Sequence, residues 1–269
     1  MITFDEAYRI ALDSARRMGT EKLPLRDVCG RILAQPVVAD MAMPPFNRAM
    51  VDGYACQRAD LDQTLHVIET IAAGYFSENT IGSGECVQIM TGAPVPEGCD
   101  CVFMVEHSEA VDDSHVRFVN ETTNDNIAAL GEDAQPDDVM LHPGHRIYPQ
   151  DIAVLASMGY AEVEVAQRPR VGVIATGDEL VEPAETPTTA QIRNSNAYSL
   201  CAQVEAAGCI AHYEGIAYDN DESLNQVIGQ ALERNDVLLL SGGVSMGKFD
   251  LVPGILKEHS IDILYNRVA

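Results

Sequence analysis

The residues best suited to chemistry follow a strongly apolar run late in the chain. The stretch LLLSGGVSMGKFD, residues 238–250, passes from three leucines into a turn of small residues. Gly242, Gly243 and Ser245 would let the backbone approach a ligand closely, and the N-terminus of the next helix would offer free N–H groups to an anion. The turn predicts a site for a phosphate or another oxyanion, although a tight turn without a ligand explains the same glycines.

Carboxylates recur at or just past the ends of apolar runs in the same part of the chain. These residues are Asp178, Glu179, Asp219 and Asp250. An acid beside an anion site repels the anion unless a cation lies between them, and carboxylate oxygens are ligands for Mg²⁺. The acids therefore predict a Mg²⁺ site that bridges to phosphate. Asp219 opens DNDESL before a predicted helix, so helix capping is an equal alternative for it.

Asn194-Ser195-Asn196 adds polar side chains before another predicted helix. Helix capping explains these residues, and so does a position at the same edge of the sheet as the predicted anion site.

The seven cysteines lack Cys-x-x-Cys spacing, which favours reduced core thiols. His142 and His145 flank a Pro-Gly pair, which indicates a turn rather than a metal site.

Alternating strands and helices must position these side chains. Strands are predicted at residues 170–176, 210–216, 237–240 and 261–265, and helices at 196–207, 222–233 and 251–258. This alternation predicts a parallel sheet with helices on its faces. Ligands bind beyond the carboxyl ends of the strands in such sheets, which is where the polar residues above would lie.

The first 165 residues have a different pattern of apolar and turn residues. Apolar residues at helical spacing predict helices at residues 4–18 and 150–158. Short β runs alternate with Gly, Pro and Asp-Asp turns at residues 65–71, 85–89, 101–105 and 115–119. This pattern predicts a small β-rich module between the two helices.

The composition excludes several partners. The formal net charge is −24, with 17 Lys and Arg against 41 Asp and Glu. Nucleic acids and anionic membranes require basic patches, so we expect neither as a partner. No apolar run reaches the roughly 18 residues of a membrane helix, and residues 1–15 resemble an amphipathic helix more than a signal peptide. We therefore expect a cytoplasmic protein.

Six motifs together carry a family resemblance. In chain order they are PPFNRAMVDGYA (44–55), MTGAPVPEG (90–98), GED (131–133), ATGDEL (175–180), NSN (194–196) and SGGVSMGKFD (241–250). Their order and spacing resemble the MoeA/gephyrin E-domain family of molybdenum cofactor biosynthesis, the molybdopterin molybdenumtransferases. The resemblance covers essentially the whole chain.

The resemblance implies an α/β multidomain fold. A mixed α+β domain would comprise residues 1–45 and 124–168, with a β-rich domain inserted at residues 46–123. Residues 169–269 would form a three-layer α/β, MogA-like molybdopterin-binding domain. Family members continue further, into the rest of this domain and a C-terminal β-barrel. We therefore expect the third domain to be incomplete and the barrel to be absent.

The resemblance also implies an activity and its partners. Family members insert molybdate into adenylylated molybdopterin and release AMP, and they use Mg²⁺. They are homodimers, and each active site is shared between two subunits. The implied partners are therefore molybdopterin-AMP, molybdate, a second copy of the chain and other molybdenum cofactor synthesis proteins.

Individual residues take roles from the matched motifs. Glu179, Asp52 and Asp133 match catalytic residues, and Asp52, Thr91 and Asp133 would approach the site from the partner subunit. Thr91 would bind substrate. The other implied substrate-binding residues are Asn194, Ser195, Asn196, Gly242, Gly243 and Ser245, and the implied metal ligands are Asp219 and Asp250.

Departures from the family keep two alternatives open. Residues 128–130, Ala-Ala-Leu, replace basic residues that many members carry, and the Pro-Gly-Lys-Pro and Gly-Leu-Pro-Gly-Asn-Pro loops do not occur in the sequence. A non-catalytic molybdopterin-binding or scaffold protein, similar to gephyrin, or an inactive fragment is one alternative. An enzyme that adenylylates molybdopterin is the other, although such enzymes consist of the α/β domain alone.

Overall fold

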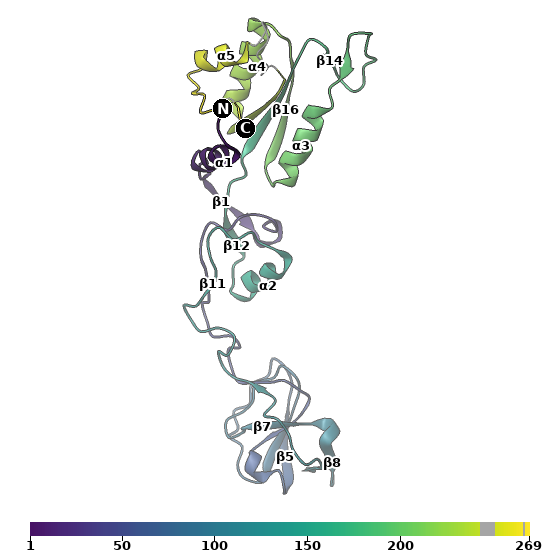
Figure 1. Ribbon diagram of the computed structural model, residues 1–269. Helices are drawn as coiled ribbons and strands as arrows, with labels where there is room; N and C mark the ends of the chain where they lie inside the picture. Colours follow the sequence, from purple (N-terminus) through teal and green to yellow (C-terminus); the bar gives the residue numbers. More distant parts are fainter. Residues whose placement is uncertain (243–250, 266) are drawn as a thin grey trace. The chain divides into compact units, whose positions relative to one another are not determined.

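The computed structural model describes residues 1–242, 251–265 and 267–269 (Figure 1). The chain divides into two compact units. The first comprises Met1–Gln35, Gly144–Pro149 and Glu162–Ala269, and the second comprises Pro36–Pro143 and Gln150–Ala161. Each unit contains its own buried apolar clusters.

A six-stranded sheet forms the centre of the second unit. Its spatial order is β7-β4-β6-β5-β9-β8, and β5 and β6 pair in parallel while the other neighbours are antiparallel. The strands are β4 Gly53–Cys56, β5 Thr64–Ile71, β6 Glu85–Ile89, β7 Cys101–Met104, β8 Ser108–Ala110 and β9 His115–Phe118. These bounds confirm the four predicted β runs.

Alternate side chains of this sheet enter two different cores. Ala55 and Val102 belong to one buried cluster, and their neighbours Cys56 and Phe103 belong to the other. A strand points successive side chains to opposite faces, so both faces of the sheet are covered. All seven cysteines of the chain are free thiols, and Cys56, Cys86 and Cys101 are buried in the second cluster.

Short strand pairs connect the rest of the second unit. Strand β2, Val37–Val38, pairs with β11, Val139–Leu141, and β3, Arg48–Ala49, pairs with β10, Ile127–Ala128. Helix α2, Pro149–Ser157, follows. Two-residue strands show no periodicity in a sequence, so neither β3 nor β10 carries a clear strand signal.

The first unit contains the predicted parallel sheet. Its order is β16-β13-β17, with β13 Arg170–Thr176, β16 Ile210–Ala217 and β17 Val237–Ser241. Helix α3, Asn196–Ala206, packs on one face, and helices α4, Asp221–Arg234, and α5, Val252–Glu258, pack on the other (Figure 1). The expected three-layer α/β arrangement is therefore confirmed. Between β13 and α3, the two-residue strands β14, Leu180–Val181, and β15, Ile192–Arg193, pair in parallel.

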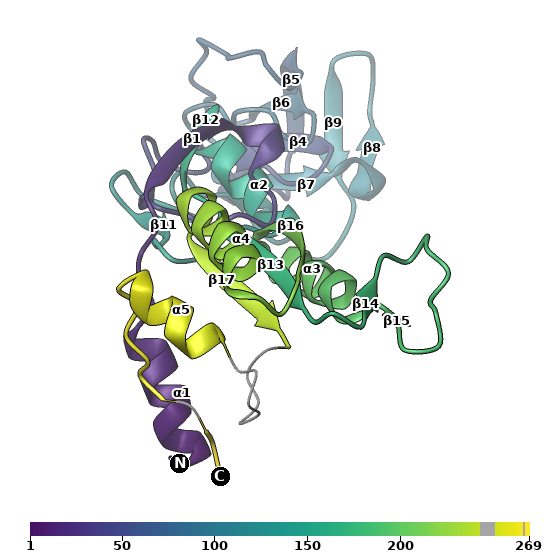
Figure 2. The ribbon, with the colours of Figure 1, turned by 90° about the horizontal axis from the view of Figure 1, so that it is seen from above.

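The N-terminal segment of the same unit begins with helix α1, Phe4–Asp13. Thr3 caps it, because the Thr3 hydroxyl accepts from the Glu6 N–H and the Glu6 carboxylate accepts from the Thr3 N–H. Strand β1, Thr20–Pro24, then pairs antiparallel with β12, Glu162–Ala166. The two ends of the chain lie side by side, with Ile2 bridged to Val268 (Figure 2).

Within the described residues, no helix has the length and apolar composition needed to cross a membrane.

Two predicted elements are wrong. The helix predicted for residues 4–18 ends at Asp13, where the Ser14 hydroxyl donates to the Ile10 carbonyl at 2.7 Å and the following residues are mostly exposed. Residues 261–265 form no strand. Their apolar side chains lie partly in solvent, with Leu264 63% exposed, because the segment pairs with no strand among the described residues.

Candidate functional site

A cavity of about 150 Å³ lies at the carboxyl edge of the parallel sheet. It is formed where β13 and β17 end and by the segment that carries β14 and β15. Its lining residues are Thr176, Glu179, Leu180, Ile192, Arg193, Asn194, Ser195, Asn196, Ser241 and Gly242. The structure thus places five of the predicted site residues, Glu179, Asn194, Ser195, Asn196 and Gly242, around one space.

Gly177 determines where the Glu179 side chain lies. Gly177 has φ +144°, and a Cβ added there would lie 2.5 Å from Oε2 and 2.7 Å from Oε1 of Glu179. The Glu179 carboxylate therefore packs directly over the Gly177 backbone. The backbone of Glu179 is held as well, because its carbonyl accepts from the Ile192 N–H at 2.8 Å.

Three acids lie close together beside this cavity. Asp178 Oδ1 accepts a hydrogen bond from the Asp219 N–H at 3.1 Å. Burial, followed by the charges of Asp178 and Glu179, raises the pKa of Asp219 above its ordinary value. A cation would relieve this repulsion. Within the described residues no group of three His, Cys, Asp or Glu side chains is arranged to hold a metal ion, and Asp250 lies outside them.

The three polar residues at the start of α3 differ in burial. Asn194 is 2% exposed; its Oδ1 accepts from the Ala197 N–H at 3.3 Å, and its Nδ2 donates to the Tyr213 hydroxyl at 2.9 Å. Asn194 therefore satisfies one N–H of the first turn of α3, whereas the N-cap residue Ser195 makes no capping hydrogen bond with its side chain. Ser195 and Asn196 are exposed, and Asn196 Nδ2 donates to Ser241 Oγ at 3.3 Å. The side chains of Ser195 and Asn196 are therefore more accessible to a ligand than the buried side chain of Asn194.

Gly242 allows the ends of β13 and β17 to approach each other. Its φ is +100°, and a Cβ there would collide with the carbonyl oxygen and the hydroxyl of Thr176. Any other residue would be strained in this conformation and would separate the two strand ends. Gly243 and Ser245, the other residues predicted for this turn, lie outside the described residues.

Arg193 is a cavity residue that the motifs did not identify. Among the described residues it is the one cationic side chain in the lining, and its Nε donates to the Glu185 carbonyl at 3.1 Å. The available signal was its position directly before Asn194-Ser195-Asn196 in a chain that has only 17 Lys and Arg. An arginine at this edge suits the anion that the glycine turn predicts.

The second unit joins two other predicted residues by direct hydrogen bonds. Asp52 Oδ1 accepts from the Thr91 N–H at 2.6 Å and from the Thr91 hydroxyl at 2.7 Å. These bonds, the backbone one first, lower the pKa of Asp52 below its ordinary value. Both residues are exposed, so the ionised carboxylate lies at the surface with a fixed orientation.

Asp133 lies in a turn held to the segment before Asp52. The N–H of Asp133 donates to the Met43 carbonyl at 2.8 Å, and the N–H of Gly131 donates to the Pro44 carbonyl at 2.9 Å. The Asp133 side chain is exposed and has no hydrogen bond within the part of the chain that the structure describes. The pairing of β3 with β10 joins the same segments, so the three motifs of this unit are adjacent.

These features define an α/β protein with a polar cavity at the carboxyl edge of a parallel sheet and a β-rich module inserted earlier in the chain. Two family models match. Residues 2–159 match the MoeA N-terminal region (domain I and II), and residues 172–265 match a probable molybdopterin binding domain. The chain belongs to the MoeA family, and the resemblance seen in the motifs is confirmed.

Individual relatives agree with this assignment. The chain is 38% identical over 279 residues to a molybdopterin molybdenumtransferase of Bacillus subtilis (strain 168), covering 100% of this chain and 65% of the relative. It is 35% identical over 275 residues to that of Staphylococcus aureus (strain Mu50), covering 100% and 66%. The chain therefore spans about two thirds of the length of these relatives.

Solved structures support the fold. A molybdopterin biosynthesis MoeA protein from Pyrococcus horikoshii OT3 superposes with a TM-score of 0.82 at 32% identity, covering 90% of this chain and 66% of that one. A second structure, titled as the MoeA protein from Pyrococcus horikosii, gives a TM-score of 0.81 at 29% identity and covers 96% and 66%. The multidomain α/β fold is thereby confirmed.

Proposed function

We propose that this chain acts in molybdenum cofactor biosynthesis, inserting molybdate into adenylylated molybdopterin with release of AMP. The observation that carries the proposal is the polar cavity at the carboxyl edge of the parallel sheet. It lies within residues 172–265, which match the probable molybdopterin binding domain. The relatives named molybdopterin molybdenumtransferase supply the reaction class.

The chain's own residues would act by binding and positioning. Gly242 keeps the backbone at the cavity free of a side chain, so a phosphate could approach closely, and Arg193 would supply a positive charge. Glu179, fixed over Gly177, would present its carboxylate to the reacting groups from a constant direction. Positioning and electrostatic stabilisation are the contributions that a phosphate-releasing step needs most.

Mg²⁺ is part of the proposal, with Asp219 and Asp250 as its protein ligands. The fit rests on charge: burial and then the neighbouring charges of Asp178 and Glu179 raise the pKa of Asp219, so a cation here would be stabilised by three acids. When bound, Mg²⁺ would neutralise phosphate oxygens and so favour release of AMP. The described residues do not form a complete ligand set, and no further step is assigned to the metal.

Asp52, Thr91 and Asp133 enter the proposal through a homodimer. They belong to the second unit, whereas the cavity belongs to the first. We propose that a second copy of the chain supplies them to the site. The fixed Asp52 carboxylate and the exposed Asp133 carboxylate suit this role because both face solvent. A monomeric mass at micromolar concentration in analytical ultracentrifugation would contradict it.

The proposed enzymatic activity is tested by measuring AMP release from adenylylated molybdopterin in the presence of Mg²⁺, with and without molybdate. We expect molybdate to stimulate release, and Glu179→Gln to lower the rate by roughly 100-fold or more, as for loss of a catalytic carboxylate. Glu185→Gln is the matched control, because Glu185 is an exposed acid of the same segment that does not line the cavity. Equal rates with and without molybdate would contradict the proposal.

A non-catalytic molybdopterin-binding protein is the second candidate, and one observation favours it. Residues 128–130 bring no positive charge to the segment before Gly131, and Leu130 is 55% exposed there. The same preparation distinguishes the two functions. Saturable binding of molybdopterin without AMP release would support the binding protein. The second experiment fuses to this chain the third of the Bacillus subtilis relative that it does not match. AMP release should be absent from this fusion protein as well.

A further inference from the structure

A second cavity of the first unit lies away from the candidate site. It has a volume of about 440 Å³ and is formed where β13 and β16 begin, whereas the candidate site lies where β13 and β17 end. The seven residues of β13 separate the two cavities, about 20 Å at the usual rise per residue. None of the predicted site residues lines this second cavity.

Three arginines and no acidic residue line the cavity among the residues that the structure describes. Arg31, Arg146 and Arg168 come from three separate segments. The whole chain has only 17 Lys and Arg against 41 Asp and Glu, so three cations around one space stand against the general charge of the protein. At physiological salt the Debye length is about 8 Å, so an anion in the cavity would respond mainly to these nearby arginines.

Neutral groups, more than carboxylates, hold the arginines. Arg168 donates from Nε to the Gly208 carbonyl at 2.8 Å and from Nη2 to the Cys209 carbonyl at 2.6 Å. Arg31 is the exception, since its Nη2 donates to Glu21 at 2.6 Å as well as to the Ala166 carbonyl at 2.7 Å. Each guanidinium has five N–H donors, so both arginines keep donors for a ligand.

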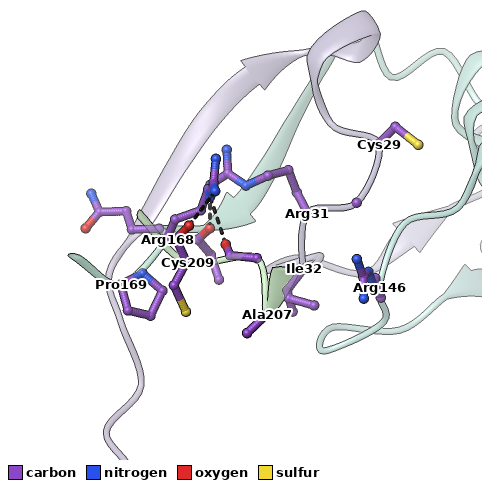
Figure 3. Close-up of a pocket in the computed structure, with 12 residues that line it drawn as sticks. Cys29, Arg31, Ile32, Arg146, Arg168, Pro169, Ala207 and Cys209 are labelled. Atoms are coloured by element: carbon purple, nitrogen blue, oxygen red, sulfur yellow. Dashed lines mark hydrogen bonds between the residues drawn. The ribbon is translucent and has the colours of Figure 1, made fainter. Parts of the chain in front are cut away.

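Arg146 has neither a hydrogen bond nor an ion pair from its side chain within the described residues, and it is exposed. Figure 3 shows Arg31 and Arg168 beside the carbonyl oxygens to which they donate, and Arg146 apart from them beyond Ile32. Arg146 is therefore the cation of this group with all of its donors uncommitted.

Backbone hydrogen bonds fix the walls of the cavity. The Gly30 N–H donates to the Ile147 carbonyl at 2.7 Å, and the Ile147 N–H donates back to the Arg31 carbonyl at 2.8 Å. The Ala166 N–H donates to the Ile32 carbonyl at 2.8 Å. The segments that carry Arg31, Arg146 and Arg168 are thus joined before any ligand arrives, which lowers the entropic cost of binding.

We propose that the cavity lined by Arg31, Arg146 and Arg168 is a second anion site, which binds the phosphate of a small phosphorylated molecule. Arginine is suited to phosphate because its planar donors match two oxygens at once. The volume exceeds the space that a free phosphate needs and lies within the range of small-molecule pockets. The inference concerns residues outside the candidate site and does not depend on the proposed function.

The test compares inorganic phosphate with a nucleoside monophosphate by calorimetric titration of the intact chain. We expect saturable binding of both at millimolar or lower concentration, with the nucleotide tighter. Arg146→Gln should weaken binding about tenfold, as for loss of a charged hydrogen-bond donor. The Arg146 side chain makes no hydrogen bond or ion pair among the described residues, so this variant should unfold at the same temperature as the unaltered chain.

Two control variants locate the ligand. Arg16→Gln removes the same charge from an exposed position outside both cavities and should leave binding unchanged. Arg193→Gln removes the cationic side chain of the candidate site, so it identifies any phosphate bound there, and the binding that depends on Arg146 should persist in this variant. The inference is overturned if neither probe binds, if Arg146→Gln and Arg16→Gln have equal effects, or if Arg193→Gln alone abolishes binding.

Discussion

One carboxylate oxygen of Asp52 accepts two hydrogen bonds from Thr91, one from its N–H at 2.6 Å and one from its hydroxyl at 2.7 Å. Thr91→Val removes the hydroxyl and keeps the N–H. Because the backbone bond is the larger cause of the lowered pKa, we expect the pKa of Asp52 to rise in the variant but to stay below its ordinary value of 3.8. An NMR titration of the Asp52 side-chain carbonyl carbon measures this.

The same pair predicts a dependence of stability on pH. A lowered folded pKa means that Asp52 stabilises the fold above its unfolded pKa, and that this contribution disappears as pH falls through the folded pKa. The variant should therefore lose stability at neutral pH and converge with the unaltered chain in acid. Thr70→Val, which removes a hydroxyl bonded to Gln88 on the same sheet, is the control. An unchanged Asp52 pKa in Thr91→Val would contradict the assignment of the bonds.

Gly177→Ala should disturb the candidate site through Glu179. The new Cβ would lie within 2.7 Å of both carboxylate oxygens, and φ +144° is unfavourable for alanine. We expect the Glu179 side chain to turn away and the rate of AMP release to fall as it does in Glu179→Gln. Combining both substitutions should lower the rate no further than either alone, because each removes the same group. If the double variant lost the rate of both single variants combined, Gly177 would affect AMP release independently of Glu179.

The sequence predicted the elements with strong periodicity and missed those without it. The apolar runs of residues 170–176, 210–216 and 237–240 could be assigned to parallel strands because each contributes apolar side chains to the helices on both faces of the sheet. Residues 261–265 have a similar composition and form no strand, since strand formation also requires a partner with free backbone groups. Composition alone does not reveal that partner.

The candidate site was predictable where a motif joined polar residues to a strand end. Glu179, Asn194 and Gly242 were found in this way and line one cavity. Arg193 was not, because an isolated arginine beside a two-residue strand gives no pattern. The orientation of the Asn194 side chain also depends on Tyr213, which lies on a strand that follows later in the chain and contacts Asn194 only in the folded state.

Gly254→Ala should stabilise the first unit. Gly254 lies in helix α5, is exposed, and has open space where a Cβ would be added. Glycine is less favourable than alanine in a helix, so the free energy of unfolding should increase by roughly 0.5–1 kcal/mol. Chemical denaturation measures the change. Gly208→Ala, with equal space but φ +87°, should instead destabilise, and stabilisation by both would contradict the backbone argument.

Asp236→Asn should weaken the start of the parallel sheet. Asp236 accepts from the Arg170 N–H at 2.9 Å and from the Arg170 guanidinium at 2.9 and 3.1 Å, and these bonds lower the pKa of Asp236 to about 2. The stabilisation is present above the ordinary pKa of 3.8 and is lost as pH falls through about 2. The variant should therefore be less stable at neutral pH and differ little near pH 2. Asp62→Asn, which removes an exposed acid of the second unit, is the control for the loss of one carboxylate.

Tyr213→Phe should destabilise the segment before α3. The Tyr213 hydroxyl donates to Glu182 at 2.6 Å and accepts from Asn194 Nδ2 at 2.9 Å, so its removal leaves a buried amide without that partner. An unsatisfied buried donor costs about 1–3 kcal/mol. Tyr198→Phe removes a hydroxyl bonded to the same Glu182 but leaves Asn194 untouched, and Tyr198 is 47% exposed. We expect a clearly smaller loss in urea denaturation for Tyr198→Phe, and equal losses would mean that Glu182, rather than Asn194, depends on these hydroxyls.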